Sequence, residues 1–171
     1  MSFADAKTGW TLKRGDIELT TDRGKTWNKV IKPEGVKDIE AISLVTTSEG
    51  YLLTSERVLY KTQDGGKTWS SVTLDLKKYE QMKFLPTGTP GYPPSVAMRF
   101  FDANQGVIVM SLVGGGSKVV ALRTADGGQT WTDEEVPTPI GTFHLTHDGK
   151  YLTVNPELES GKIIVLHYTG G

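Results

Sequence analysis

The stretch Thr62-Gln63-Asp64-Gly65-Gly66-Lys67-Thr68-Trp69 occurs three times in this chain with small changes. The other copies are Thr20-Thr21-Asp22-Arg23-Gly24-Lys25-Thr26-Trp27 and Thr124-Ala125-Asp126-Gly127-Gly128-Gln129-Thr130-Trp131. A motif that recurs at long intervals along one chain indicates a repeat protein, because each copy marks the same point of a supersecondary unit. The unit around this motif therefore decides the fold.

Each copy follows a short run of strand-forming residues, and a second such run lies upstream, with turn residues between the two. In the second repeat the runs are 51–54 and 58–62, separated by Ser55-Glu56-Arg57. A fourth, degenerate copy has runs at 151–154 and 162–168. A single four-stranded sheet cannot bury both faces and must stack on neighbours. The sequence predicts an all-β chain of about four four-stranded antiparallel β-propeller blades.

The repeats predict one domain, 1–171, with repeats at about 1–31, 36–76, 95–137 and 139–171. The first and last repeats are incomplete in strand pattern, since the first strand is almost absent at Met1-Ser2-Phe3. We expect part of a larger six- or seven-bladed propeller, or a chain that completes itself by association with a second copy. The third strand of the last blade would then keep an unpaired edge. If the ring is also open, the outward faces of the first and last blades would leave apolar rows unburied.

A second, weaker sequence repeat relates the stretch from Phe3 to Gly9 to the stretch from Phe101 to Gly106. It lies just before the upstream strand of the first and third repeats. This second repeat adds one more turn and one more strand to the repeat unit.

Composition excludes several classes of protein. The chain has 19 basic and 20 acidic residues, which gives no basic footprint for nucleic acid. It has no cysteine, which excludes disulfides and thiolate metal sites. No run approaches the roughly 18 apolar residues of a transmembrane helix, and no signal peptide is visible at the start. We expect no cofactor and no metal.

The chemistry of the octapeptide predicts a structural joint. A short carboxylate at the start of a tight loop can accept backbone N–H groups that have no strand partner. Glycine adopts the positive φ that such a loop needs, the second threonine is expected to begin the next strand, and the indole covers apolar surface between blades. The residues assigned this structural role are Asp22, Gly24, Thr26, Trp27, Asp64, Gly66, Thr68, Trp69, Asp126, Gly128, Thr130 and Trp131.

These octapeptides resemble the Asp-box, or bacterial neuraminidase repeat, of sialidase-like propellers. The longer unit is most similar to the photosystem II stability/assembly-factor-like repeat proteins. The resemblance implies that each Asp-box lies between the third and fourth strands of a blade, away from the central ligand face. It also implies an extracytoplasmic or cell-surface protein. Such propellers include enzymes, lectins and assembly factors, so the resemblance alone does not fix the function.

The sequence favours a non-catalytic binding or assembly scaffold with a protein partner or a glycan. The alternative is a fragment of a sialidase-like or other glycoside hydrolase, or a glycan-binding lectin. Sialidases resemble one another in a triad of arginines that binds the substrate carboxylate, but this chain has only five arginines. Two of them, Arg14 and Arg57, lie in predicted turns and Arg23 lies inside an Asp-box, so a triad is difficult to assemble.

One irregular segment separates the second and third repeats. Residues 75–82 could form a short helix, and the insertion at 85–95 is rich in proline and glycine, which a central strand does not tolerate. Long loops in compact domains are often functional. We therefore predict a binding loop here, with Tyr92 and Arg99 as candidate contact residues.

Overall fold

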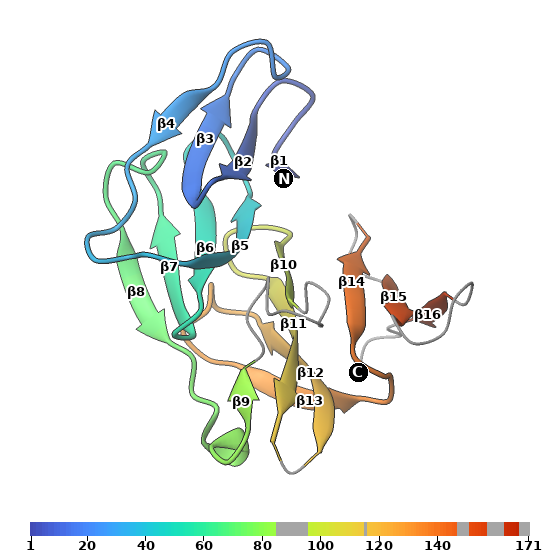
Figure 1. Cartoon of the computed structure of the whole chain (residues 1–171). Helices are drawn as coiled ribbons and strands as arrows, with labels where there is room; N and C mark the ends of the chain where they lie inside the picture. The colour runs from blue at the N-terminus through green and yellow to red at the C-terminus, as the bar shows by residue number, and fades with distance from the viewer. Residues whose placement is uncertain (85–95, 115, 147–150, 157–162, 168–171) are drawn as a thin grey trace. The chain divides into compact units, whose positions relative to one another are not determined.

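The computed structural model describes residues 1–84, 96–114, 116–146, 151–156 and 163–167 (Figure 1). The chain forms two compact units, residues 1–74 and 75–171. Each unit contains two antiparallel sheets of the β-propeller blade type, and the all-β propeller class predicted from the repeats is confirmed.

The first unit holds two four-stranded blades in which each strand pairs with the next along the chain. The first blade consists of β1 (Ser2–Phe3), β2 (Gly9–Lys13), β3 (Asp16–Thr20) and β4 (Asn28–Val30). The second blade consists of β5 (Ile39–Leu44), β6 (Gly50–Thr54), β7 (Val58–Thr62) and β8 (Ser70–Thr73). The first strand of the first blade has only two residues, as the repeat pattern predicts.

The second unit begins with a single 3₁₀ turn, η1 (Lys77–Tyr79), within the segment where a short helix is expected. Its larger blade contains β10 (Val96–Phe100), β11 (Gly106–Val113), β12 (Ser117–Thr124) and β13 (Thr132–Val136), with β9 (Lys83–Phe84) added at the far end of β11. The last blade has three described strands, β14 (Gly141–Leu145), β15 (Tyr151–Pro156) and β16 (Ile164–His167).

The turn between the first two strands carries its own aspartate cap. The Asp5 carboxylate accepts the N–H groups of Lys7 and Thr8 at 2.6 and 2.7 Å. The cap recurs at Asp102 in the third blade, where the carboxylate accepts two N–H groups at 2.7 Å. An Asx-type cap therefore holds this turn in both blades.

The strand register shifts the alignment of the second, weaker sequence repeat by one residue. Phe3 pairs with Gly9, and Phe100, rather than Phe101, pairs with Gly106. A Cβ on Gly9 would lie 2.5 Å from the Phe3 ring, so only glycine lets the phenyl ring lie across the neighbouring strand.

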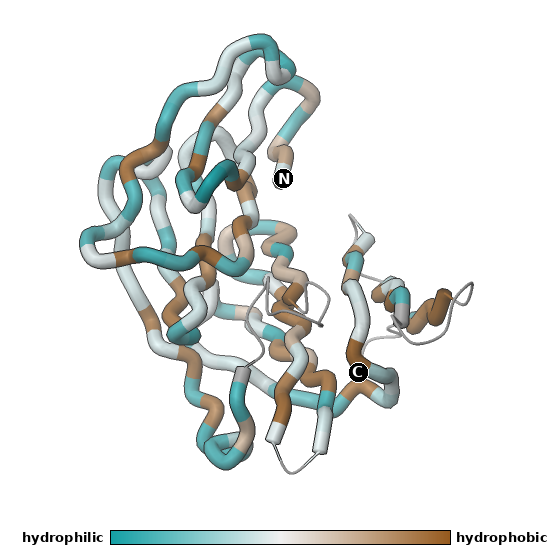
Figure 2. The backbone as a smooth tube through the Cα atoms, in the orientation of Figure 1, coloured by the Kyte–Doolittle hydropathy of each residue, from teal (hydrophilic) through white to brown (hydrophobic). Residues whose placement is uncertain are grey.

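Each unit has its own core between two blades. In the first unit Trp10, Ile17 and Val30 of the first blade pack against Ile42 and Leu52 of the second. In the second unit the core joins the apolar faces of the third and fourth blades: Val107, Val109, Val119, Ala121, Phe143, Leu152 and Val154. Figure 2 shows hydrophobic, brown stretches along the strands and hydrophilic, teal stretches in the connecting loops.

The outward face of the first blade does not carry the predicted apolar row. Thr11 pairs with Glu18, and Lys13 pairs with Asp16, on the face opposite the Trp10 core. Lys13 lies 3.9 Å from Glu18 across this face. Residues alternate between the two faces of a strand, so this polar set balances the buried one. The prediction is wrong for the first blade. In the fourth blade Val165 is 59% exposed, but it pairs with Thr153, which pairs with His144, so this face has no apolar row there either.

Candidate functional site

All three Asp-boxes lie in the loop between the third and fourth strands of a blade. In the second blade one oxygen of Asp64 accepts the N–H groups of Lys67 and Thr68, both at 2.9 Å. The other oxygen accepts the Thr68 hydroxyl at 2.6 Å. The carboxylate thus closes the loop by binding donors that the strand ladder leaves unpaired.

The threonine that precedes each aspartate completes the loop. The Thr62 hydroxyl donates to Asp64 and accepts the N–H of Gly66, both at 2.9 Å. This threonine is 1% exposed, and its role was not predicted from the sequence. The second threonine does not begin the next strand as predicted, because Thr68 is bonded to the carboxylate inside the loop and β8 starts at Ser70.

These hydrogen bonds lower the pKa of the three aspartates. The pKa of Asp22 and that of Asp126 fall to about 2, chiefly because the second threonine donates its hydroxyl and its N–H to the carboxylate. The pKa of Asp64 is lowered further for the same reason. A carboxylate that is ionised and engaged in this way is suited to holding a loop, not to transferring protons.

The Asp-box loop is also tied to the first turn of its own blade. A backbone N–H of the loop donates to a carbonyl of that turn in three blades, at 3.0 Å from Arg23 to Lys7 and at 2.8 Å from Gly65 to Ser48. Gly127 donates to Asn104 at 2.8 Å in the third blade. Two loops at the same end of the blade therefore form one joint.

The three tryptophans differ in what they contact. The Trp27 and Trp131 indoles donate to glycine carbonyls of their own loops, at 3.1 and 3.0 Å. Trp69 instead reaches the preceding blade, where its indole donates to the Ile31 carbonyl at 2.8 Å and its ring lies 6.0 Å from that of Trp10. The predicted inter-blade contact is thus present at Trp69.

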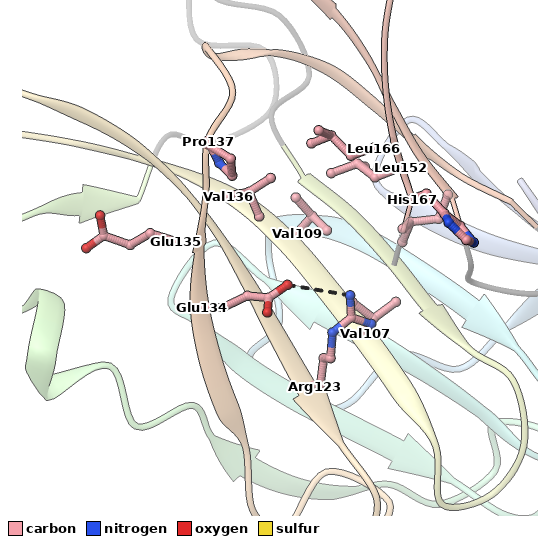
Figure 3. A pocket seen from close by; sticks show the side chains of 11 residues that line it. Val107, Val109, Arg123, Glu134, Glu135, Val136, Pro137, Leu152, Leu166 and His167 are labelled. Atoms are coloured by element: carbon pink, nitrogen blue, oxygen red, sulfur yellow. Dashed lines mark ion pairs between the residues drawn. The ribbon is translucent and has the colours of Figure 1, made fainter. Parts of the chain in front are cut away.

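A cavity of about 310 Å³ lies in the second unit between the third and fourth blades (Figure 3). The third blade contributes Val107, Val109, Arg123, Glu134, Glu135, Val136 and Pro137, and the fourth contributes Leu145, Leu152, Leu166 and His167. Its size falls at the lower end of the range for ligand pockets, and its lining combines an apolar floor with a charged rim.

Some of the charged side chains at the rim of the pocket form ion pairs. The Glu134 carboxylate lies 3.7 Å from the Arg123 guanidinium, and Figure 3 shows the two side chains pointing toward each other. Glu135 points the other way and pairs with Lys118. Neighbouring residues of a strand face opposite sides, so the two glutamates are not a facing acid and base pair.

Arg99 lies beside this pocket, in strand β10 and not in a loop, so its predicted position was wrong. Arg99 pairs with Val107, which also pairs with Arg123. Paired residues on neighbouring strands lie on the same face, so both arginines lie on one face of the blade. Burial lowers the pKa of Arg99. Tyr92, the other predicted contact residue, lies outside the described residues.

Sequence reasoning missed the pocket because its floor consists of ordinary core residues from separate repeats. A comparison of the repeats gives only a partial signal for its rim. Arg123 occupies the place of Leu19 in the first blade, since each lies opposite the residue that follows the strand-starting glycine. The second blade also has a charged residue at this place, Lys61 opposite Tyr51, so the charge by itself does not single out the third blade.

Among the described residues, no three His, Asp or Glu side chains gather in a way that could hold a metal ion. The same residues contain no helix long and apolar enough to cross a membrane.

Residues 1–79 match the family described as "Photosynthesis system II assembly factor YCF48". The curated photosystem II assembly lipoprotein Ycf48 of Synechococcus sp. (strain CC9902) is 24% identical over 129 residues, which cover 63% of this chain and 33% of that protein. The matched chain thus spans about a third of its relative's length. The resemblance to the photosystem II assembly-factor repeats is confirmed.

Among solved structures, "YCF48 bound to D1 peptide" covers 99% of this chain and 52% of its own, with a TM-score of 0.56 at 20% identity. This similarity supports the propeller fold. The GH74 enzyme of Niastella koreensis covers 81% of this chain and 21% of its own, at 19% identity and a TM-score of 0.48. That likeness is too distant to support an argument about activity.

Proposed function

We propose that this chain is a non-catalytic propeller scaffold that binds a polypeptide segment of another protein on the extracytoplasmic side. The observation that carries the proposal is the pocket between the third and fourth blades, which opens beside a strand edge. The sheet order β14-β15-β16 leaves β16 at the edge of the described part of its blade (Figure 1). An extended peptide can pair with such an edge while one of its side chains enters the adjacent pocket.

The chemistry of the pocket supports binding over catalysis. Glycoside hydrolysis in most families needs two carboxyl groups facing one bond, one of them with a raised pKa. In this pocket Glu134 is paired with Arg123, and Glu135 points to the opposite side of β13. An apolar floor with a few charges at its rim is typical of a site that anchors a side chain.

The relatives support the choice of a protein partner and of the compartment. The Synechococcus relative is named as an assembly lipoprotein, and the solved YCF48 structure is named as bound to a D1 peptide. A lipoprotein is held at a membrane surface by its lipid. We propose by analogy that this chain acts outside the cytoplasm and assembles with a protein.

The test compares three ligand classes on the full chain. A peptide array that includes a D1 peptide, a glycan array and a turnover assay with a fluorogenic sialoside and xyloglucan are run on wild type and Leu166→Asp. We expect peptide binding that the variant loses, no glycan binding and no turnover. Glycan binding without peptide binding, or turnover that Arg123→Ala abolishes, would replace the scaffold with a lectin or a hydrolase.

A further inference from the structure

The outer strand of the second blade carries no charge, unlike the outer strands of the first and third blades. Strand β8 (Ser70–Thr73) is the last strand of its sheet, and all its residues are exposed (Figure 1). Strand β4 of the first blade carries Lys29. Strand β13 of the third blade carries a run of three carboxylates, Asp133, Glu134 and Glu135. Charges on an edge strand hinder its pairing with another chain, and β8 lacks this protection.

The difference is sharpest at one position of the repeat. Ser71 follows its Asp-box tryptophan by two residues, as Lys29 does in the first blade and Asp133 does in the third. Ser71 pairs with Tyr60 of β7, and Lys29 pairs in the same way with Glu18 of β3. The second blade thus has a small hydroxyl where the first and third blades have a charge.

The peptide groups of Ser71 and Thr73 point away from β7. The Leu74 N–H donates to the Arg57 carbonyl at 3.0 Å, one step beyond the pair of Val58 with Thr73. Hydrogen-bonded and non-bonded pairs alternate along an antiparallel ladder. Thr73 and Ser71 therefore form non-bonded pairs with β7, so their N–H and C=O groups face outward. Among the described strands, β8 pairs with β7 alone.

The two ends of β8 carry opposite charges. Lys67 lies before the strand and Asp75 lies after it, and both residues are exposed. Asp75 lies 3.4 Å from Lys77, but 68% of its side chain is exposed, so its carboxylate stays accessible. Antiparallel pairing of two identical strands about a twofold axis brings the start of each strand to the end of the other. Each Lys67 then lies near the Asp75 of the other copy, whereas parallel pairing would bring like charges together.

We infer that two copies of this chain associate by antiparallel pairing of their β8 strands. The outward peptide groups of Ser71 and Thr73 supply the hydrogen bonds, and the charges at the strand ends fix the direction. Such a short strand buries far less than the roughly 1,200 Å² of a stable interface, so the dimer is weak and forms at protein concentrations on the order of 100 μM. This surface is separate from the pocket, and the inference does not depend on polypeptide binding there.

Sedimentation velocity of the full chain, from about 10 to about 500 μM, measures the association. We expect a reversible dimer that Ser71→Lys weakens about tenfold or more, because the variant gives β8 the charge that Lys29 gives β4. Asn28→Lys is the matched control, since it adds the same charge at an exposed position of β4 and should leave the dimer unchanged. Circular dichroism checks that both variants fold.

A second test uses the absence of cysteine from the sequence. Ser71→Cys and Lys29→Cys place a single thiol at equivalent exposed positions of β8 and β4. Opposite residues of paired strands lie about 5 Å apart, so a short bis-maleimide can join two Ser71→Cys chains within the dimer. We expect roughly tenfold more crosslinked dimer from Ser71→Cys than from Lys29→Cys. This comparison decides the matter if Ser71→Lys does not fold.

Charge reversal tests the direction of the strands. Lys67→Asp and Asp75→Lys should each weaken the dimer, and the variant with both changes should restore it, because each charge again meets its opposite in the other copy. A double variant that stays as weak as the single variants would overturn the antiparallel pairing. A monomer over the whole concentration range, a dimer that Ser71→Lys leaves intact, or equal crosslinking of the two cysteine variants would overturn the inference as a whole.

Discussion

Each unit packs one blade against the next, and the space between the two blades is filled differently in the two units. In the first unit Trp69 lies between two blades, bonded to the Ile31 carbonyl and tilted against Trp10. In the second unit a cavity of about 310 Å³ lies between the third and fourth blades, with Arg123 and Glu134 at its rim. One repeat pattern therefore gives a closely packed contact between one pair of blades and a cavity between another.

The largest effect is expected from opening the closed joint. Trp69→Ala removes a partly buried indole that packs against the core of the first unit, and it should lower the free energy of unfolding by about 3 kcal/mol. Trp27→Ala is the matched control, because its indole bonds to its own loop at Gly24. We expect a loss of about 1 kcal/mol there. Urea unfolding measures both, and equal losses would show that Trp69 has no special inter-blade role.

A substantial loss of stability is also expected at Gly66, because this residue lies against Val30 of the preceding blade. Gly66→Ala must adopt a φ of 89° and also displace Val30. We expect it to cost about 2 kcal/mol in stability. Gly24→Ala has a similar φ of 82°, but its Cβ would meet only Trp27 of its own loop, at 3.5 Å. It should cost about 1–2 kcal/mol, and urea unfolding that gives Gly24→Ala the larger loss would contradict the close packing at Val30.

The Asp-box loops, unlike the inter-blade spaces, should behave alike in both units. Asp22→Asn and Asp126→Asn should each lower the melting temperature by a few degrees at pH 7. Both carboxylates have a folded pKa of about 2, below the usual value of 3.8. Their contribution is therefore present above pH 4 and is lost as the pH falls to about 2.

The difference between wild type and each of these variants should accordingly shrink between pH 4 and pH 2. Thermal melts at pH 2, 3, 4 and 7 measure it. A variant whose deficit persists unchanged at pH 2 would show that the carboxylate charge does not hold the loop.

The smallest effect is expected at the pocket rim. Glu134→Gln removes the charge that faces Arg123 at 3.7 Å, but the glutamate side chain is 54% exposed. Exposed ion pairs contribute little, so the free energy of unfolding should change by less than about 0.5 kcal/mol. A loss above 1 kcal/mol in urea unfolding would show that the ion pair holds the blades together and that the rim is structural.

The repeats made much of the fold predictable. A motif in three copies, with strand runs at similar offsets, identified the blades and their order, and the family resemblance implied the place of each Asp-box. The loop interior was less accessible. The Thr62 hydroxyl links Asp64 to Gly66 only once the loop has closed, so its role depends on geometry that the spacing does not contain.

The binding loop predicted at 85–95 stays a prediction, because that segment lies outside the described residues, but Arg99 was assigned to the wrong element. Proline and glycine drew attention to 85–95 as the candidate loop, and Arg99 was grouped with it. The register places Arg99 in β10 beside Val107 instead. A site built from the faces of two blades has no continuous motif, because its residues come from strands far apart in the sequence.

The sequence by itself determined the blade pattern and the chemistry of the joints, because both depend on residues within a few positions of one another. Only the tertiary structure decided which tryptophan bridges two blades and where a pocket opens. Trp27, Trp69 and Trp131 stand at the same place in three copies of one motif. The Trp69 indole bonds to the Ile31 carbonyl of the preceding blade, whereas the Trp27 and Trp131 indoles bond to glycine carbonyls of their own loops. The role of such a side chain depends on what packs against its far side, and local sequence carries no information about that surface.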